Sequence, residues 1–243
     1  METLWFYIVA VMVAVYVVLD GFDLGAGALH LFVARNDTER RTILQSIGPV
    51  WDGNEVWLLA GGGAMVLAFP RLYASGFSGF YLPLMMVLWF LILRAISIEF
   101  RSHLESQVWR PLWDVVFSIS SLLLAVFLGA ALGNVVRGVP LTEEGFFFAP
   151  LWTSFRPDTA ELGVLDWFTV TVGVTSLLAL TYHGAMWVIL KTEAAIRQRA
   201  QQAAGLIWPI LILFLLLVTV FTFRIQPQVP ARLNTHRIAY LLA

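Results

Sequence analysis

Acidic side chains occur inside two strongly apolar stretches of the 243-residue sequence, where a membrane would normally exclude them. The first stretch contains Asp20 and Asp23, and the second begins with Asp52, Asn54 and Glu55. A carboxylate near the centre of a membrane helix costs about 2.5 to 3.5 kcal/mol, so it usually faces a partner, a cavity or a proton path. These residue types therefore indicate proton or ion handling inside a bilayer.

The first pair of carboxylates lies on a helix that a neighbour can approach closely. Asp20 and Asp23 are three residues apart, which places both side chains on one helical face. Gly21 and Gly25 form a small-xxx-small pair beside them, so a packed neighbour would hide the carboxylates from lipid. Two interpretations stay open. In the structural one, each Asp caps a break in its own helix, bonds a neighbouring helix or pairs with an Arg. In the functional one, the pair carries protons or ions.

The second cluster combines titratable and amide groups. A carboxylate buried without a charge partner titrates nearer to neutral pH, as a proton carrier requires. Asp52, Asn54 and Glu55 are therefore the candidate proton pathway. Alternatively, Asp52 and Glu55 are first-turn residues that complement the dipole of a helix starting near Pro49. We favour this second interpretation for Glu55 and the proton role for Asp52.

Arg94, near the end of a third apolar stretch, can neutralise one of these carboxylates. An ion-paired Asp is a poor proton carrier, so the partner of Arg94 has a structural role. We predict that this partner is Asp23, and that Asp20, Asp23 and Arg94 form a structural charge cluster. The alternative for Arg94 is that it extends to the lipid headgroups.

The elements that hold these residues are membrane helices. Hydrophobic residues make up 59% of the sequence and charged residues 13%, which is too apolar for a soluble domain of this length. Apolar runs of about 20 residues predict six spans, at residues 4–33, 49–69, 75–97, 112–135, 164–190 and 206–224. The sequence therefore predicts an all-α polytopic bundle that forms one integral membrane domain over residues 1–243. Its parts are a first four-helix bundle (4–135), an external loop (136–163) and part of a second bundle (164–243).

Basic residues are unevenly shared between the two sides of this bundle. Eight lie in the connectors on one side, and three lie in the loops on the other. The eight are Arg35, Arg40, Arg41, Arg101, Arg110, Lys191, Arg197 and Arg199, and the three are Arg71, Arg137 and Arg156. The positive-inside rule makes the first side cytoplasmic. The N-terminus is then external, and Asp52 lies close to the cytoplasm.

The remaining composition excludes several function classes. A net charge of −1 and the lack of a phosphate-binding glycine loop argue against a nucleic-acid partner. Without cysteine there is no thiolate ligation. The four histidines, His30, His103, His183 and His236, form no metal-ligand signature, so we predict no metal site in this chain. A proton-coupled transporter and a purely structural membrane subunit both remain compatible with these features.

Several motifs in order resemble one family, subunit II of the cytochrome bd-type quinol oxidases. They are Asp20-Gly21-Phe22-Asp23-Leu24-Gly25-Ala26-Gly27, Arg35-Asn36-Asp37-Thr38-Glu39-Arg40-Arg41, Trp51-Asp52-Gly53-Asn54-Glu55-Val56-Trp57, Phe77-Ser78-Gly79-Phe80-Tyr81, Trp109-Arg110 with Trp113-Asp114, and Gly133-Asn134 with Gly138-Val139-Pro140. The resemblance is dense over residues 15–140 and thinner beyond.

The resemblance implies a multi-pass subunit of a terminal oxidase in the bacterial inner membrane. Such a complex oxidises quinol, reduces dioxygen to water and takes up cytoplasmic protons, which makes aerobic respiration electrogenic. It also implies a larger partner, subunit I, that carries two haems b, one haem d and the quinol-binding loop. This chain would hold no catalytic residue, would stabilise subunit I among the membrane lipids, and would place Asp52 at the entrance of a proton pathway. A bound quinone and a small third subunit are further expectations.

Two features depart from the family pattern. Family members are typically longer, with further helices after the sixth, so we expect this chain to lack the end of the second bundle. Position 55 is Glu where some relatives have Gln, which resembles the cyanide-insensitive branch and adds a titratable group near Asp52.

Overall fold

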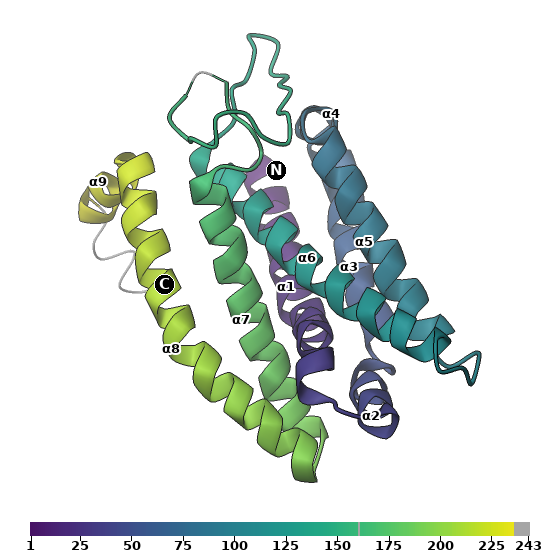
Figure 1. Cartoon of the computed structure of the whole chain (residues 1–243). Coiled ribbons are helices and arrows are strands. Elements are labelled where there is room, and N and C mark those ends of the chain that lie inside the picture. The colour runs from purple at the N-terminus through teal and green to yellow at the C-terminus, as the bar shows by residue number, and fades with distance from the viewer. Residues whose placement is uncertain (160, 236–243) are drawn as a thin grey trace.

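The computed structural model describes residues 1–159 and 161–235, and this part of the chain is built from helices without any β-strand (Figure 1). The helices are α1 (Glu2–Val33), α2 (Asp37–Ile47), α3 (Trp51–Ala68), α4 (Pro70–Gly79), α5 (Tyr81–Phe100), α6 (Trp109–Arg137), α7 (Trp167–Lys191), α8 (Ala194–Ile225) and α9 (Gln228–Thr235). Helices α1, α5, α6, α7 and α8 are long and apolar enough to cross a membrane, and the bent pair α3 and α4 makes a sixth span if counted as one. The predicted all-α polytopic architecture is confirmed.

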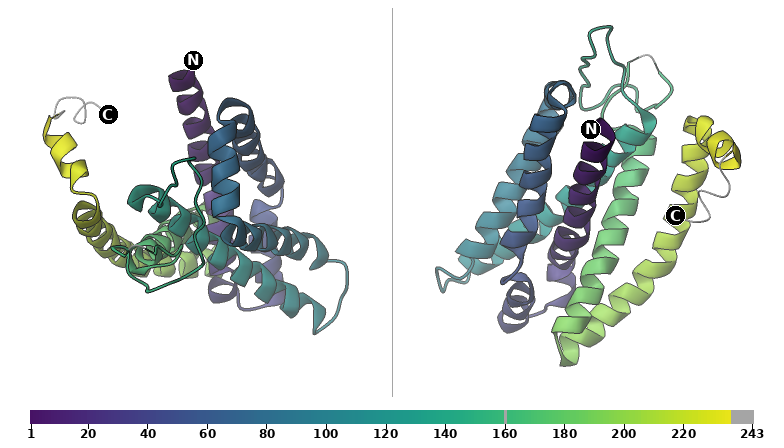
Figure 2. Two further views of the ribbon diagram at one scale, coloured as in Figure 1. Left: turned by 90° about the horizontal axis from the view of Figure 1, so that it is seen from above. Right: turned by 180° about the vertical axis from the view of Figure 1, so that it is seen from behind.

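The bundle has two distinct ends. The N-terminus, α4 and the long segment between α6 and α7 lie at one end, called here the loop end (Figures 1 and 2). Helix α2, the turn between α5 and α6 and the turn between α7 and α8 lie at the other, called here the α2 end. The connectors that carry the eight basic residues are therefore all at the α2 end.

Helix α1 is the central element of the packing. It contacts α3, α6 and α7 along its length, and α2 follows it through a short turn. Its second half is almost completely buried, including Asp20, Asp23 and His30, whereas much of its first half is exposed and apolar. Polar groups on the second half of α1 therefore face other helices and not lipid.

Helices α1 and α7 touch through their backbones. A Cβ atom on Gly25 would overlap the carbonyl oxygen of Leu180 and the backbone of Gly184, and a Cβ on Gly184 would overlap the backbone of Gly25. Next to this crossing, the rings of Phe22 and Trp187 stack with centroids 4.0 Å apart. The predicted close approach along the Gly21 and Gly25 strip is confirmed, with α7 as the neighbour. How far residues 4–135 and 164–243 form separate bundles stays a prediction.

The segment between the second and third predicted spans differs from expectation. The sequence predicted a loop over residues 70–74, and the structure has the short helix α4, bent by 119° from α3. Pro70 occupies the first turn of α4, where its fixed φ suits a helix start and its missing N–H costs no hydrogen bond. Phe80 then separates α4 from α5, whose first turn contains Pro83.

Two polar connectors are also more helical than predicted. Residues 37–47 form α2, capped by the side chain of Asn36, which accepts a hydrogen bond of 2.9 Å from the backbone N–H of Glu39. Residues 194–202, predicted as a connector, form the first turns of α8. This stretch is rich in Ala, Gln and Arg, which favour helices strongly. Its polar residues therefore indicate that the helix has left the membrane, and not that the helix has ended.

Candidate functional site

A buried ion-pair cluster joins α1, α3 and α5. Arg94 on α5 is fully buried, and its Nη2 donates a hydrogen bond of 2.7 Å to Oδ1 of Asp20 on α1. The same nitrogen forms an ion pair with Glu55 on α3. One guanidinium therefore links three membrane helices that lie far apart in sequence.

The prediction that Arg94 pairs with Asp23 is wrong. Oδ2 of Asp23 accepts a hydrogen bond of 2.8 Å from Nδ2 of Asn54, which also donates to the carbonyl oxygen of Leu19 over 3.2 Å. Three residues on a helix differ by about 60° in direction, so Asp20 reaches α5 while Asp23 reaches α3. The two carboxylates share a face but not a partner.

The three residues of the predicted proton pathway separate on α3. Asn54 is buried against α1, and Glu55 is half-buried beside Arg94. Asp52 is exposed in the first turn of α3, and within the described chain its carboxylate makes no hydrogen bond or ion pair. Only Asp52 is therefore free to meet a group from outside the chain. The roles of Asp52, Asn54 and Glu55 in proton transfer stay predictions.

The buried cluster contains more hydrogen-bonding capacity than its own residues satisfy. Oδ2 of Asp20, Oδ1 of Asp23, and Nε and Nη1 of Arg94 are buried with no partner among the described residues. Asp20 and Glu55 share a single guanidinium and Asp23 has only an amide partner, so the group has the composition of a site that can exchange protons. Tyr16, buried one turn before Asp20, was not foreseen, although its spacing of four residues from Asp20 places it on the same face.

A second buried network lies at the α2 end around Asp114 of α6. Its Oδ1 lies 2.6 Å from Nε2 of His30 and accepts a hydrogen bond of 2.6 Å from Nε of Arg101. Its Oδ2 accepts hydrogen bonds from Nη2 of Arg101 at 3.1 Å and Nη1 of Arg40 at 3.2 Å. Arg101 also donates to Asp37 over 2.8 Å. This network ties α1, α2, α5 and α6 together. In the sequence, Arg40 and Arg101 served only to predict which side of the bundle faces the cytoplasm.

Helix α2 is held to α8 by a smaller clasp. Glu39 forms an ion pair of 2.6 Å with Arg199 and accepts a hydrogen bond of 2.7 Å from the backbone N–H of Arg35. The Arg199 guanidinium and the backbone N–H of Arg35 hold the pKa of Glu39 below its usual range. Arg199 also donates to the carbonyl oxygen of Val33 over 2.7 Å, so the clasp fixes the turn between α1 and α2 as well.

Each described histidine is bonded to a protein group through one of its two ring nitrogens. His30 is buried with Nε2 against Asp114, and Nε2 of His183 lies 3.0 Å from the carbonyl oxygen of Val18. His103 bonds the carbonyl oxygen of Glu99 within its own turn, and His236 lies outside the described residues. In the described ranges there is also no group of three or more acidic or His side chains that could hold a metal ion.

Comparison with known proteins matches these features to one family. The family described as cytochrome bd terminal oxidase subunit II matches residues 1–243. A probable cytochrome oxidase subunit 2 of Haemophilus influenzae is 39% identical over 198 residues, which are 82% of this chain and 51% of that protein. The cytochrome bd-I ubiquinol oxidase subunit 2 of Escherichia coli K12 is 37% identical over 201 residues, with 83% and 52% covered. The Bacillus subtilis cytochrome bd ubiquinol oxidase subunit 2 is 35% identical over 204 residues, with 84% and 57% covered.

The fold agrees with a solved structure of the same kind of complex. A chain of the bd oxidase from Geobacillus thermodenitrificans superposes with a TM-score of 0.72, covering 93% of this chain and 67% of that chain at 18% identity. The present chain spans about half the length of the curated relatives it matches. A family match over the whole sequence, three relatives above 30% identity and a shared helical fold lead to one conclusion: this multi-pass membrane protein belongs to the cytochrome bd terminal oxidase subunit II family.

Proposed function

We propose that this chain acts as subunit II of a bd-type quinol oxidase in the bacterial cytoplasmic membrane. The complex would oxidise quinol and reduce dioxygen to water with protons taken from the cytoplasm. The family match and the names of the relatives support this proposal. The two haems b, the haem d and the quinol site would belong to a larger subunit I, as the resemblance to this family implies. A bound quinone and a small third subunit remain part of the proposal.

An exposed stripe on α3 supports a partner at that helix. Asp52, Val56, Leu59, Gly63 and Leu67 are all exposed and recur every three or four residues, so they form one continuous line along the helix. A Cβ atom on Gly63 would meet nothing within 4 Å in the described chain, so at this point of the stripe the backbone of α3 is not covered by a side chain. Glycine at such a position lets a helix of another subunit approach closely. We infer that subunit I packs against this stripe and is stabilised by it.

The observation that carries the proton role is the isolation of Asp52. Of the three predicted pathway residues, Asp52 is the one that is exposed and has no hydrogen bond or ion pair within the described chain, and it lies at the α2 end of the stripe. A carboxylate in that place can take a proton from water and pass it to a group of the docked subunit. Asn54 and Glu55, which face Asp23 and Arg94, would set the position of the helix turn that presents Asp52.

The arrangement of charges supports a cytoplasmic α2 end. The connectors with the eight basic residues all lie there, and the N-terminus lies at the loop end. By the positive-inside rule the α2 end faces the cytoplasm and the N-terminus faces outward. Asp52 would then stand on the side from which protons are supplied. Asp20, Asp23 and Arg94 would hold the three helices together.

The test is the Asp52→Asn substitution in the complex assembled with its larger subunit. Asparagine keeps the size of the side chain but cannot carry a proton, so oxygen consumption with quinol should fall about a hundredfold or more, within the usual range for loss of a proton-transfer group. Haem content and yield should stay unchanged. Asp158→Asn, at an exposed residue of the loop end, is the matched control. Full turnover of an assembled Asp52→Asn complex would refute proton delivery through Asp52.

A further inference from the structure

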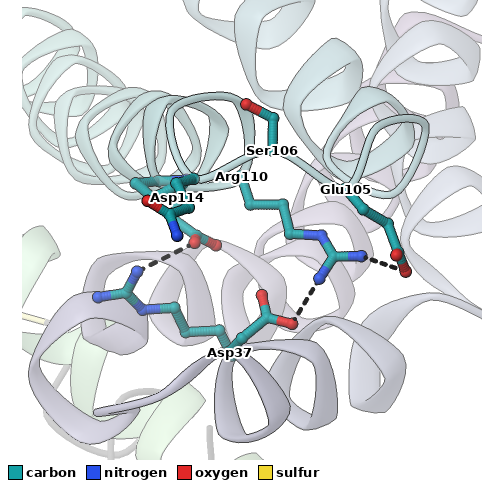
Figure 3. Close-up of a pocket in the computed structure, with 8 residues that line it drawn as sticks. Asp37, Glu105, Ser106, Arg110 and Asp114 are labelled. Carbon is teal, nitrogen blue, oxygen red and sulfur yellow. Dashed lines mark hydrogen bonds and ion pairs between the residues drawn. The ribbon is translucent and has the colours of Figure 1, made fainter.

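A hollow of about 410 Å³ opens at the α2 end, between α2, the 101–108 segment and the first turn of α6 (Figure 3). It is lined by Asp37, Arg40, Glu105, Ser106, Gln107, Arg110, Pro111 and Asp114. Its volume suits a compact polar ligand or the headgroup of a larger one. The proposed proton role does not use this hollow.

The carboxylates that line the hollow are already occupied by arginines. Both oxygens of Asp114 accept hydrogen bonds from arginine. Asp37 receives Arg101 on one oxygen and Arg110 on the other, at 2.8 and 2.9 Å. Glu105 accepts from Arg110 over 3.1 Å, but its side chain is 90% exposed and held only by that contact. The acidic groups of the wall therefore have little capacity left to bind a cation.

The capacity that remains in the wall is mostly that of donors. Arg40 uses one nitrogen, Nη1, for Asp114, and its Nη2 makes no hydrogen bond among the described residues. The hydroxyl oxygen of Ser106 accepts from the backbone N–H groups of Val108 and Trp109, so its own hydrogen is free to be donated. The first N–H groups of α6 are already bonded to Ser106, so the helix adds only the positive end of its dipole. Such a wall favours a ligand that brings several acceptor oxygens.

The hollow lies at the level where headgroups meet protein. Span α5 ends at Phe100 and span α6 begins at Trp109, so the 101–108 segment runs along the membrane surface. The rings of Phe100, Trp109 and Trp113 pack edge to face beside it, and Nε1 of Trp109 donates to the carbonyl oxygen of Phe100 over 2.7 Å. Tryptophan is enriched at this depth of a bilayer, and basic pockets between helices at this level bind lipid headgroups.

We propose that this hollow binds a phosphate group, held by Arg40 and the hydroxyl of Ser106 beside the positive end of the α6 dipole. The phosphate belongs either to the headgroup of an anionic phospholipid at the membrane surface or to a free phosphate from solution. Arginine suits this ligand because its planar guanidinium can donate two parallel hydrogen bonds to phosphate oxygens.

The experiment measures phospholipid retained by the full chain after purification in detergent with phosphatidylglycerol. The wild-type chain should retain this lipid with an affinity about tenfold higher than the Arg40→Gln chain, the size expected for one charge-assisted hydrogen-bond pair. Arg40→Lys should recover only part of the affinity, because the ammonium group of lysine lacks the planar geometry that donates two parallel hydrogen bonds. Ser106→Phe should also lose the lipid by filling the hollow, and it leaves every ion pair of the network in place.

The matched control is Arg71→Gln, at the smaller hollow of the loop end. This change removes the same charge and should leave lipid retention as in the wild type. Binding of radiolabelled inorganic phosphate separates the two sources: lipid retention that depends on Arg40 and resists excess phosphate identifies the headgroup, and phosphate binding that depends on Arg40 with equal lipid retention identifies free phosphate. Equal lipid retention together with equal phosphate binding in the wild-type, Arg40→Gln and Ser106→Phe chains would overturn the proposal, as would loss of lipid only in Arg71→Gln.

Discussion

At the scale of single residues, the buried cluster divides its carboxylates by partner. Asp20 and Glu55 share the guanidinium of Arg94, whereas Asp23 has only the amide of Asn54. Removing one side of a buried ion pair leaves the other charge uncompensated, which costs about 3–5 kcal/mol. Loss of a charge opposite a neutral amide costs much less. Asp20 and Asp23, which the sequence presents as a matched pair, should therefore respond differently to the same substitution.

Asp20→Asn should lower the yield and thermal stability of the folded chain clearly, because buried Arg94 loses its fully buried charge partner and keeps only the half-buried Glu55. Asp23→Asn should leave both close to wild type, since the new side chain still offers a carbonyl oxygen to Asn54. Fluorescence-detected size-exclusion chromatography with a heating step measures both variants in detergent. Equal losses in the two variants would contradict the division of partners in the structure.

The residue types of this cluster could be predicted from the sequence, but the pairings could not. Charged residues inside apolar runs identify Asp20, Asp23 and Arg94 without a structure, because their cost in lipid demands partners. Which carboxylate reaches Arg94 depends on the rotation of α1 against α5, and a shift of about 60° exchanges the two. No local pattern in the sequence sets that rotation. The hydrogen bonds around Asp114 depend in the same way on four helices meeting at one point.

At the scale of helices, the crossing of α1 and α7 tolerates no side chain. Gly184→Ala should separate the two helices and reduce the folded fraction strongly, because the added Cβ would overlap the backbone of Gly25. Gly62→Ala is the matched control, since a Cβ there meets nothing within 4 Å and alanine favours a helix by about 1 kcal/mol over glycine. Thermal unfolding in detergent should rank Gly62→Ala at or above wild type and Gly184→Ala far below. A Gly184→Ala chain as stable as wild type would exclude this crossing.

The clasp between α2 and α8 should give a pH dependence of its own. The pKa of Glu39 is lowered in the folded chain, so its contribution to stability is complete above the ordinary glutamate pKa of about 4.3. It is lost as the pH falls through the lower folded value. The stability difference between the wild-type and Glu39→Gln chains should therefore be constant near neutral pH, below about 1 kcal/mol for such a surface pair, and vanish in acid. A difference that grows as the pH falls would contradict this assignment.

At the scale of the whole molecule, the helical fold and the number of spans follow from hydropathy alone, while the boundaries do not. Length and apolarity define a span because the bilayer leaves few alternatives to a helix. The same criterion does not detect α2 or the start of α8, which are polar helices at the membrane surface. It also misses the bend after Phe69, where α3 gives way to α4. Outside the bilayer core, caps and helix propensity decide the structure, and hydropathy does not report them.

The assignment of haem to a larger subunit predicts the colour of the preparation. The chain produced alone should show no haem absorption bands, because the proposal places all three haems in the larger subunit. Bands of haems b and d should appear only when the larger subunit is copurified, and the Leu59→Trp change on the α3 stripe should reduce that copurification. An absorption spectrum taken after affinity purification measures both. Haem bands in the chain alone would contradict the proposal.

The contact between Gly25 and Gly184 also sets an order for biogenesis. Helix α1 is the first of these spans to leave the ribosome, yet the strip that carries Gly21 and Gly25 is covered by α7, after α3, α5 and α6 have been inserted. Until then α1 presents a bare backbone strip to lipid or to the insertion machinery. A nascent chain arrested before α7 should therefore stay accessible to crosslinkers placed at position 25 and be degraded faster than one arrested after it.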